Sequence, residues 1–225
     1  MKTAAPYGNG AMILYYDIAA EAIGDHDDWH THEHFPERLS IPGFRRASRW
    51  IANAGNPRYL VMYEVSEVRV LSDGPYLERL NNPTPWTSRM MSNFRGMVRG
   101  FCSVVTHSGA GFGQALLSIR YAPASGTETG LREWLRAMLP GIASTPGAAS
   151  SYMLEPAAQP PMTKEQGLRG KDADLPCVLL VTGYDAKSLA RIGEEHLSGA
   201  QFEKRGATVA ARGDYHLDLV MTEGE

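Results

Sequence analysis

The chain has few of the residues that characterise a disulfide scaffold or a membrane protein. Its 225 residues include two cysteines, Cys102 and Cys177, each in an apolar run typical of a strand. Two cysteines are too few for a disulfide scaffold, so we expect buried free thiols in a reducing cytoplasm. The N-terminal residues lack the long apolar run of a signal peptide, and no segment reaches the roughly 18 apolar residues that a membrane span needs.

Excess charge of one sign is also missing. The formal net charge of -3 gives no electrostatic footprint for nucleic acid. A hydrophobic content of 43% with 21% charged residues describes a globular protein that can bury a sizeable core. We therefore expect a cytoplasmic protein whose partner is a small-molecule ligand, with neither nucleic acid nor a membrane as a partner.

Histidine is concentrated in one short stretch. Four of the seven histidines lie between His26 and His34. If this stretch is a helix, His30, His34 and Arg38 lie on one face, because residues four apart are neighbours on a helix surface. The sequence therefore predicts a polar stripe of two imidazoles and a guanidinium.

The boundaries of this helix are marked by residues with strong local preferences. Asp27 or Asp28 suits the N-cap, where acidic side chains favour the positive end of a helix. Pro36 cannot donate a backbone hydrogen bond, so we expect the helix to kink or restart there. Pro42 and Gly43 then end the segment before a strand.

The histidines have three interpretations. His30, Glu33 and His34 match H-x-x-E-H, a helical zinc pattern with two ligands and a general base, although no third ligand on a downstream helix is evident. Alternatively, His34 is a general acid/base, since a free imidazole titrates near neutral pH. For His26 and His32 we favour a third interpretation, solvated side chains on an amphipathic helix. We assign no metal and no cofactor.

Hydrophobic periodicity gives the same order of elements twice. In the first part we expect strands over 11–18, 45–52, 59–65 and 97–106, with the histidine helix and helices over 74–80 and 86–94. In the second part we expect strands over 115–121, 150–154, 178–182 and 215–221, with helices over 129–139 and 189–197. The order β-α-β-β-α-β is the ferredoxin-like unit.

We therefore predict an α+β fold of two tandem ferredoxin-like repeats, 1–108 and 109–225, that form an intramolecular dimeric α/β barrel. The glycine-rich segment 108–113 is the predicted linker. The second repeat carries an insertion near 156–176, rich in Pro, Gln, Gly and charge, which we expect to be an exposed loop or flap. We expect the barrel to be complete within one chain and any further assembly to be a closed two-fold homodimer.

The repeat can be checked by position. Four residues of the first part recur 104 positions later, namely Pro36, Ser40, Pro42 and Gly43 at Pro140, Ser144, Pro146 and Gly147. Under the same shift, the polar stripe of His30, His34 and Arg38 corresponds to Trp134, Met138 and Ile142. A scaffold with one polar copy and one apolar copy predicts a single functional site, lined by the first helix.

Several motifs resemble one known family. Trp29, Glu33-His34, Pro36–Leu39 and Pro42–Phe44 are similar to the signature of the dimeric α/β-barrel superfamily in its EthD-like branch. The segments 59–64 and 82–87 also resemble tandem members of that branch. The resemblance is good over residues 11–106, and in the second part it depends on the repeat register.

The resemblance implies ferredoxin-like halves that close a small barrel, with a cavity between sheet and helices. The wider superfamily includes cofactor-free monooxygenases, isomerases, decarboxylases and dehydratases. In the EthD-like branch the histidine of the His-x-Pro pattern, His34 here, is the residue most often suspected of chemistry. Such relatives usually carry Tyr after the Trp, where this chain has His30.

Our leading hypothesis is a cofactor-independent enzyme, a lyase, isomerase or cofactor-free monooxygenase, that acts on a small apolar or aromatic metabolite. His34 would be the acid/base in an isomerisation, dehydration or decarboxylation, with Glu33 or His30 orienting it or shifting its pKa. Arg38 would hold an anionic group. Three aromatic side chains are expected to form the walls of the site: Tyr15, Tyr63 and Trp86.

Two other hypotheses remain open. The same cavity would serve a non-catalytic small-molecule-binding or stress-type protein, since the second part has no polar copy. A metal enzyme would use His30 and His34 with Glu33 or His32. His107 and His216 would join it only if their side chains point into the same cavity.

Overall fold

The structure is a computed structural model that describes residues 7–224. Its first elements are β1 (Gly10–Ile18), η1 (Ala20–Ala22), α1 (Ile23–Trp29), η2 (His30–His34), α2 (Phe35–Leu39), β2 (Phe44–Ala52), β3 (Tyr59–Val65), η3 (Val68–Ser72), α3 (Gly74–Asn81), α4 (Pro85–Met91) and β4 (Phe94–Ser108). These are followed by β5 (Ala115–Pro123), α5 (Glu128–Ala143), β6 (Ala148–Pro156), α6 (Lys164–Arg169), β7 (Ala173–Asp174), β8 (Cys177–Gly183), α7 (Ala186–Glu195), α8 (Gly199–Glu203) and β9 (Ala207–Thr222).

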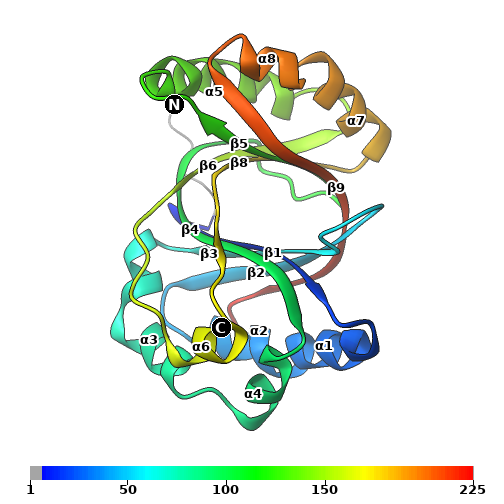
Figure 1. Cartoon of the computed structure of the whole chain (residues 1–225). Helices are drawn as coiled ribbons and strands as arrows, with labels where there is room; N and C mark the ends of the chain where they lie inside the picture. The colour runs from blue at the N-terminus through cyan, green and yellow to red at the C-terminus, as the bar shows by residue number, and fades with distance from the viewer. Residues whose placement is uncertain (1–6, 225) are drawn as a thin grey trace.

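Eight antiparallel strands close into a barrel. They pair in the order β1-β3-β2-β9-β5-β8-β6-β4, and β4 pairs back onto β1. The short β7 runs parallel to β4 at Val98 and Arg99, beyond the part of β4 that pairs with β6. Helices lie outside the barrel in two groups, α1–α4 with α6 at one end and α5, α7 and α8 at the other (Figure 1). Within residues 7–224, no helix is long and apolar enough to cross a membrane.

The strands pair in the same way in each part of the chain. The first four pair in the order β2-β3-β1-β4 and the later ones in the order β6-β8-β5-β9. Along the chain, helices follow β1 and β3 in the first set and β5 and β8 in the second. The pairs β2–β9 and β4–β6 join the two sets. The strands β4 and β9, which are 15 and 16 residues long, have the length needed to pair within both sets.

Alternation along the strands divides the core into an interior and two outer layers. In β1, Ala11, Ile13 and Tyr15 face the barrel interior, whereas Met12 and Tyr16 face the helices of the first part, because successive strand residues point to opposite sides. The interior also contains Trp50, Leu60, Met62, Cys102, Leu116, Tyr152, Leu154, Leu175, Val178, Leu180 and Tyr215. Each fully buried aliphatic side chain of this kind stabilises the fold by about 1.5–3 kcal/mol.

The predicted strands are present, with differences at their ends. The strand predicted over 59–65 has those bounds as β3. The largest difference is in β9, which begins at Ala207 rather than at residue 215. Its first half is only weakly apolar, and its pairing with β5 defines it as a strand.

The predicted N-cap of the histidine helix is wrong. Helical structure begins at Ala20, and both Asp27 and Asp28 lie inside α1. The carboxylate of Asp27 accepts hydrogen bonds from the side chains of His26 and Tyr59. Asp27 therefore binds neighbouring side chains, instead of capping the helix as its local sequence suggests.

The predicted break at Pro36 takes the form of a widened turn. The backbone N–H of Phe35 donates to the carbonyl of His30, five residues earlier, so η2 is a π-helical segment. The α2 helix then begins with Pro36 in its first turn, where the missing N–H is tolerated. Such π-helical segments occur frequently at functional sites.

The segment predicted as an exposed loop or flap over 156–176 lies against the first part of the chain and contains α6 and β7. The N–H of Ala157 donates to the carbonyl of Phe101 over 2.7 Å. Leu175 is 4% exposed and belongs to the barrel interior. Most of its residues are exposed, as predicted, and Thr163, Glu165 and Leu175 are buried.

Glycine positions explain two of the turns. Gly43 and Gly147 have φ of +96° and +94° and directly precede β2 and β6, where a residue with a Cβ would be strained. Ser40 and Ser144 are the C-cap residues of the preceding helices.

In the connection between β4 and β5, Gly113 packs against the backbone of Gly183 so closely that a Cβ would overlap it.

A fragment of residues 1–108 is expected to aggregate or self-associate. It lacks β9 and β6, so β2 and β4 become free edges and the interior face of the sheet is exposed. Size-exclusion chromatography with light scattering measures this, and co-expression with residues 109–225 is expected to restore a soluble complex. A monomeric, cooperatively folded fragment contradicts the prediction.

Candidate functional site

A cavity lies between the outer face of the first set of strands and its helices. Its volume is about 30 Å³, whereas small-molecule sites usually span about 300–1,000 Å³. Its apolar lining consists of Met12, Leu14, Tyr16, Trp29, Val61, Met91, Phe94 and Met97. Its polar lining consists of His30, His34, Arg38, Tyr63, Tyr76, Arg99, Glu165 and Arg169.

The predicted polar stripe is confirmed in its geometry. His30, His34 and Arg38 all line this cavity and are 3%, 7% and 1% exposed. The rings of His30 and His34 stack at 5.5 Å between centroids, with Trp29 at 4.2 Å from His34. The π-helical segment thus presents both imidazoles to an apolar, aromatic space.

Both imidazoles are held neutral. Burial lowers the pKa of His34 well below its ordinary value, and the nearby Arg38 guanidinium lowers it further. Burial likewise lowers the pKa of His30, with contributions from His26 and His34. The Nδ1 atoms of His30 and His34 are buried without a hydrogen-bond partner. A neutral imidazole with an unpaired nitrogen can accept a proton or bind a polar atom of a ligand.

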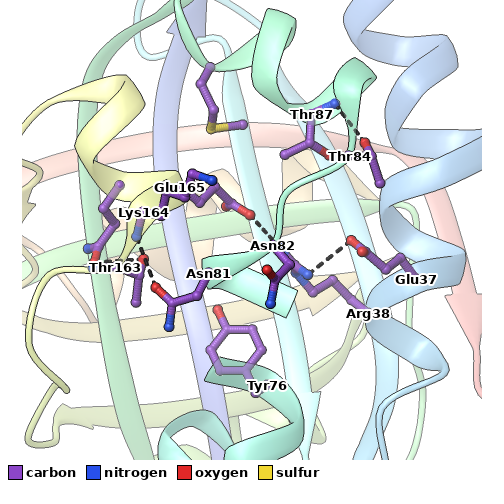
Figure 2. Close-up of polar contacts among 12 residues, drawn as sticks. Glu37, Arg38, Tyr76, Asn81, Asn82, Thr84, Thr87, Thr163, Lys164 and Glu165 are labelled. Atoms are coloured by element: carbon purple, nitrogen blue, oxygen red, sulfur yellow. Dashed lines mark hydrogen bonds and ion pairs between the residues drawn. The ribbon is translucent and has the colours of Figure 1, made fainter. Parts of the chain in front are cut away.

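The Arg38 guanidinium lies at the edge of the cavity in a cluster of charges. Its Nη1 donates to Glu37 over 3.0 Å and its Nη2 donates to Glu165 over 2.7 Å (Figure 2). Its Cζ is 5.5 Å from the centroid of the Tyr76 ring. Glu165 comes from α6, in the second part of the chain, so both parts of the chain contribute residues to the site.

Tyr63 is the predicted wall residue that the structure places in the cavity. Its hydroxyl is buried without a hydrogen-bond partner. Burial raises the pKa of Tyr63 well above its ordinary value, so the hydroxyl keeps its proton and can donate. Its ring lies 6.4 Å from that of His34, which brings a donor and a base to the same cavity.

Tyr15 and Trp86 do not line the cavity, so their predicted placement as its walls is wrong. Tyr15 points into the barrel interior, where its hydroxyl lies 2.6 Å from the Ser118 hydroxyl. The next residue, Tyr16, faces the cavity instead, as alternation along β1 requires. Trp86 is half-buried on α4 and donates to Asp25 over 3.0 Å.

Glu33 does not orient His34 by direct contact. Its carboxylate accepts hydrogen bonds from the Thr84 and Thr87 hydroxyls, at 2.5 and 3.2 Å. Thr87 also accepts a hydrogen bond from the indole N–H of Trp29. The prediction of a direct partner for His34 is corrected, because Glu33 instead ties the histidine helix to the start of α4.

The sequence did not reveal a buried hydrogen-bonded cluster of Tyr16, His26 and Asp27 beside the cavity. His26, which we expected to be solvated, is fully buried, with Nδ1 2.9 Å from Asp27 Oδ1 and Nε2 3.0 Å from the Tyr16 hydroxyl. Burial opposes ionisation of Asp27, but its contacts with His26, Arg49 and Tyr59 outweigh this and lower the pKa of Asp27. The alternation along β1 places Tyr16 beside the helices, and this was the sequence signal from which a buried partner for His26 could have been predicted. His32 is exposed, as expected.

The donor geometry gives no support to the metal hypothesis. Glu33 points away from the stacked imidazoles of His30 and His34. His216 lies on β9 with its Nδ1 2.9 Å from Asn53 Oδ1, and His107 lies on β4 against the Tyr152 ring. Among residues 7–224, no three His, Cys, Asp or Glu side chains are grouped so that they could hold a metal ion.

The fold is an α+β barrel of the ferredoxin-related class, with a cavity of mixed polar and apolar lining under one helical layer. No family model and no curated protein matches the sequence. An anthrone oxidase-like protein of known structure is similar to it, with a TM-score of 0.64, 11% identity and coverage of 96% of this chain and 93% of that chain. A "putative monooxygenase" from Fusobacterium nucleatum has a TM-score of 0.63 at 7% identity, covering 97% and 96%. A "putative chlorite dismutase" has a TM-score of 0.58 at 10% identity, covering 93% and 94%. At such identities the likeness concerns the fold, and the names describe different reactions.

The buried imidazoles are expected to make the folded state less stable in acid. Burial lowers the pKa of His26, His30 and His34 in the folded chain, so the unfolded chain binds more protons as the pH falls below about 6.5. Their stabilising contribution is therefore complete above that pH. It falls by up to about 1.4 kcal/mol per pH unit for each imidazole as the pH decreases towards the folded pKa values.

Urea unfolding between pH 5.5 and 8 measures this dependence. His30→Phe places an aromatic ring beside Trp29 and Phe35. It is expected to reduce the slope of the free energy of unfolding against pH by the equivalent of one proton taken up on unfolding. His32→Gln, at an exposed position of the same segment, is the control and should leave the slope unchanged. Equal slopes in wild type and His30→Phe would show that His30 is not held neutral.

Proposed function

We propose that the chain is a cofactor-independent enzyme that transfers a proton to or from carbon in a small apolar or aromatic metabolite. The observation that carries this proposal is the placement of His34. It is a neutral, buried imidazole with an unpaired Nδ1, in a cavity that also contains the unpaired Tyr63 hydroxyl and the Arg38 guanidinium.

In the proposed step His34 removes a proton from a carbon next to a carbonyl group. The C–H bond breaks, the proton moves to the imidazole and the electron pair moves to the carbonyl oxygen, which becomes an enolate. Tyr63 donates a hydrogen bond to this oxygen, since its hydroxyl stays protonated. Arg38 supplies positive charge at the edge of the same cavity.

This step is common to the reactions considered. Isomerisation and dehydration begin with it, and decarboxylation ends with the reverse step, the return of a proton to carbon. The names of the structural neighbours, an anthrone oxidase-like protein and a monooxygenase, add oxidation by O₂ to the reactions to be tested. In each case His30, stacked against His34, is proposed to position it.

Replacement of His34 by Gln is expected to reduce turnover by about 10²–10⁴-fold, the range for one positioned acid/base group. The substrate would come from a metabolite screen, and the readout is kcat/KM together with the urea unfolding midpoint. His32→Gln, two residues away and exposed, is the matched control and should retain activity. Unchanged turnover in a folded His34→Gln variant rules out the assignment.

The pH profile gives an independent test. A base with a lowered pKa stays neutral through pH 7, so kcat/KM should be constant there and fall only on an acidic limb. We expect the apparent pKa of this limb to lie below about 6.5, the ordinary histidine value. A limb at or above that value contradicts a buried His34 as the base.

A second candidate function is binding without catalysis. It is favoured by the polar contacts that already satisfy Arg38, the cation nearest to the candidate base. Mass spectrometry of an extract of the purified protein, before and after incubation with candidate substrates, separates the two. Recovery of every bound compound unchanged supports a binding protein.

We also propose that the chain is a tandem, EthD-like member of the dimeric α/β-barrel superfamily. The repeated strand order and the equivalent turns at Gly43 and Gly147 support this. Ile142, which the 104-residue shift aligns with Arg38, is buried in the apolar layer of the second part. We accordingly propose domains of 1–108 and 109–225, with the site on the first.

A further inference from the structure

The α6 segment covers the cavity of the first part although it belongs to the second part. Figure 1 shows the chain leaving the end of β6, running to the helices of the first part and returning to β8. There α6 packs against α3 and α4. Glu165 and Arg169, at either end of α6, line the cavity.

This cover is held mainly by polar contacts. The side chains of α6 that are buried, Glu165 and Arg169, are both charged, and its Leu168 is 47% exposed. The backbone N–H of Lys164 donates to Asn81 over 3.1 Å, and Glu165 accepts from Arg38 over 2.7 Å (Figure 2). The other walls of the cavity are barrel strands and helices of the apolar core, so α6 is the wall with few buried apolar contacts.

The charges at the cavity are balanced by this same segment. Arg38, Arg99 and Arg169 line the cavity, and all three are almost fully buried. Glu165 lies 2.7 Å from Arg38 and 3.9 Å from Arg169, and Asp172 lies 3.8 Å from Arg99 and 2.8 Å from Arg169. The carboxylate of Glu165 is therefore an acidic group placed between two guanidinium groups at the cavity wall.

We propose that the ligand of this site is an organic monoanion with an apolar body, and that its acidic group replaces Glu165 as the partner of Arg38. The cavity, at about 30 Å³, cannot hold an aromatic metabolite while α6 is in place. Entry of the ligand displaces α6, and the Glu165 carboxylate moves into solvent. The inference rests on the proposed function only in taking the same cavity as the ligand site.

The exchange has an electrostatic reason. When α6 moves away, Arg38 keeps only Glu37 as a counter-charge, and a buried charge without its partner is strongly unfavourable. An anionic ligand restores the balance, whereas a neutral ligand of the same shape does not. The unpaired Tyr63 hydroxyl and His34 Nδ1 offer further partners for ligand oxygen atoms.

The experiment compares 1-naphthoate with 1-naphthamide, which has the same ring and no charge. Isothermal titration calorimetry of the full chain is expected to show naphthoate binding at least about tenfold more tightly. Hydrogen exchange of peptides from 157–175 should increase with naphthoate and stay unchanged with naphthamide, while peptides from α7 stay unchanged with both.

Glu165→Gln provides the sharper test, since it removes the internal competitor and keeps the shape. It is expected to raise the affinity for naphthoate by about tenfold or more and to leave that for naphthamide unchanged. Glu155→Gln, which removes a carboxylate paired with Arg132 in the second part, is the matched control and should change neither affinity. Arg38→Gln, if folded by circular dichroism, should lose the preference for naphthoate.

Several results overturn the inference. These are equal affinities for naphthoate and naphthamide, weaker naphthoate binding in Glu165→Gln, or no naphthoate binding by wild type and Glu165→Gln at millimolar concentration. Binding is measured without turnover, so the two proposals fail separately. Naphthoate preference with no effect of His34→Gln on turnover rejects only the catalytic role.

Discussion

The closure of the barrel by the pairs β2–β9 and β4–β6 is the constraint on which the rest of the structure depends. Unpaired strand edges and an apolar sheet face are unfavourable in water, and closure removes both. It also determines what covers the cavity. Pro156, the last residue of β6, pairs with Cys102 of β4, so the following segment emerges beside the first part of the chain. The pairing of β7 with β4 holds its other end there, and α6 packs against α3 and α4 with Glu165 beside Arg38.

The two helical layers outside the barrel differ in polarity. The layer of the second part is an apolar cluster in which Leu135, Leu139 and Ile142 of α5 are buried. The layer of the first part buries charged and titratable groups, and these shape the site. Burial keeps the imidazoles of His30 and His34 neutral, whereas Arg38 stays charged because carboxylates lie beside it. A neutral base and a permanent cation therefore share one cavity.

The histidine helix shows how local and tertiary requirements combine. Pro36 prevents a regular α-helical hydrogen bond, and the π-helical segment before it accommodates this while both imidazoles face the sheet. On the opposite side of that helix, Glu33 binds the threonines at the start of α4 and so fixes the helix against its neighbour. This support holds His34 in position, and a base contributes to catalysis only when its position is held.

Local sequence is sufficient to predict the order of the eight barrel strands, their repeated pattern and the face shared by His30, His34 and Arg38, but not α6, β7 or α8. The predicted features follow from hydrophobic periods and from helical spacing, which are local properties of the chain. Tertiary structure decided which neighbour of each pair faces the cavity, so that Tyr16 and not Tyr15 lines it. It also decided the burial of His26 and the pairing of Arg38 with Glu165, residues 127 positions apart. Contacts at such separation depend on barrel closure, which leaves no periodic signal in either segment.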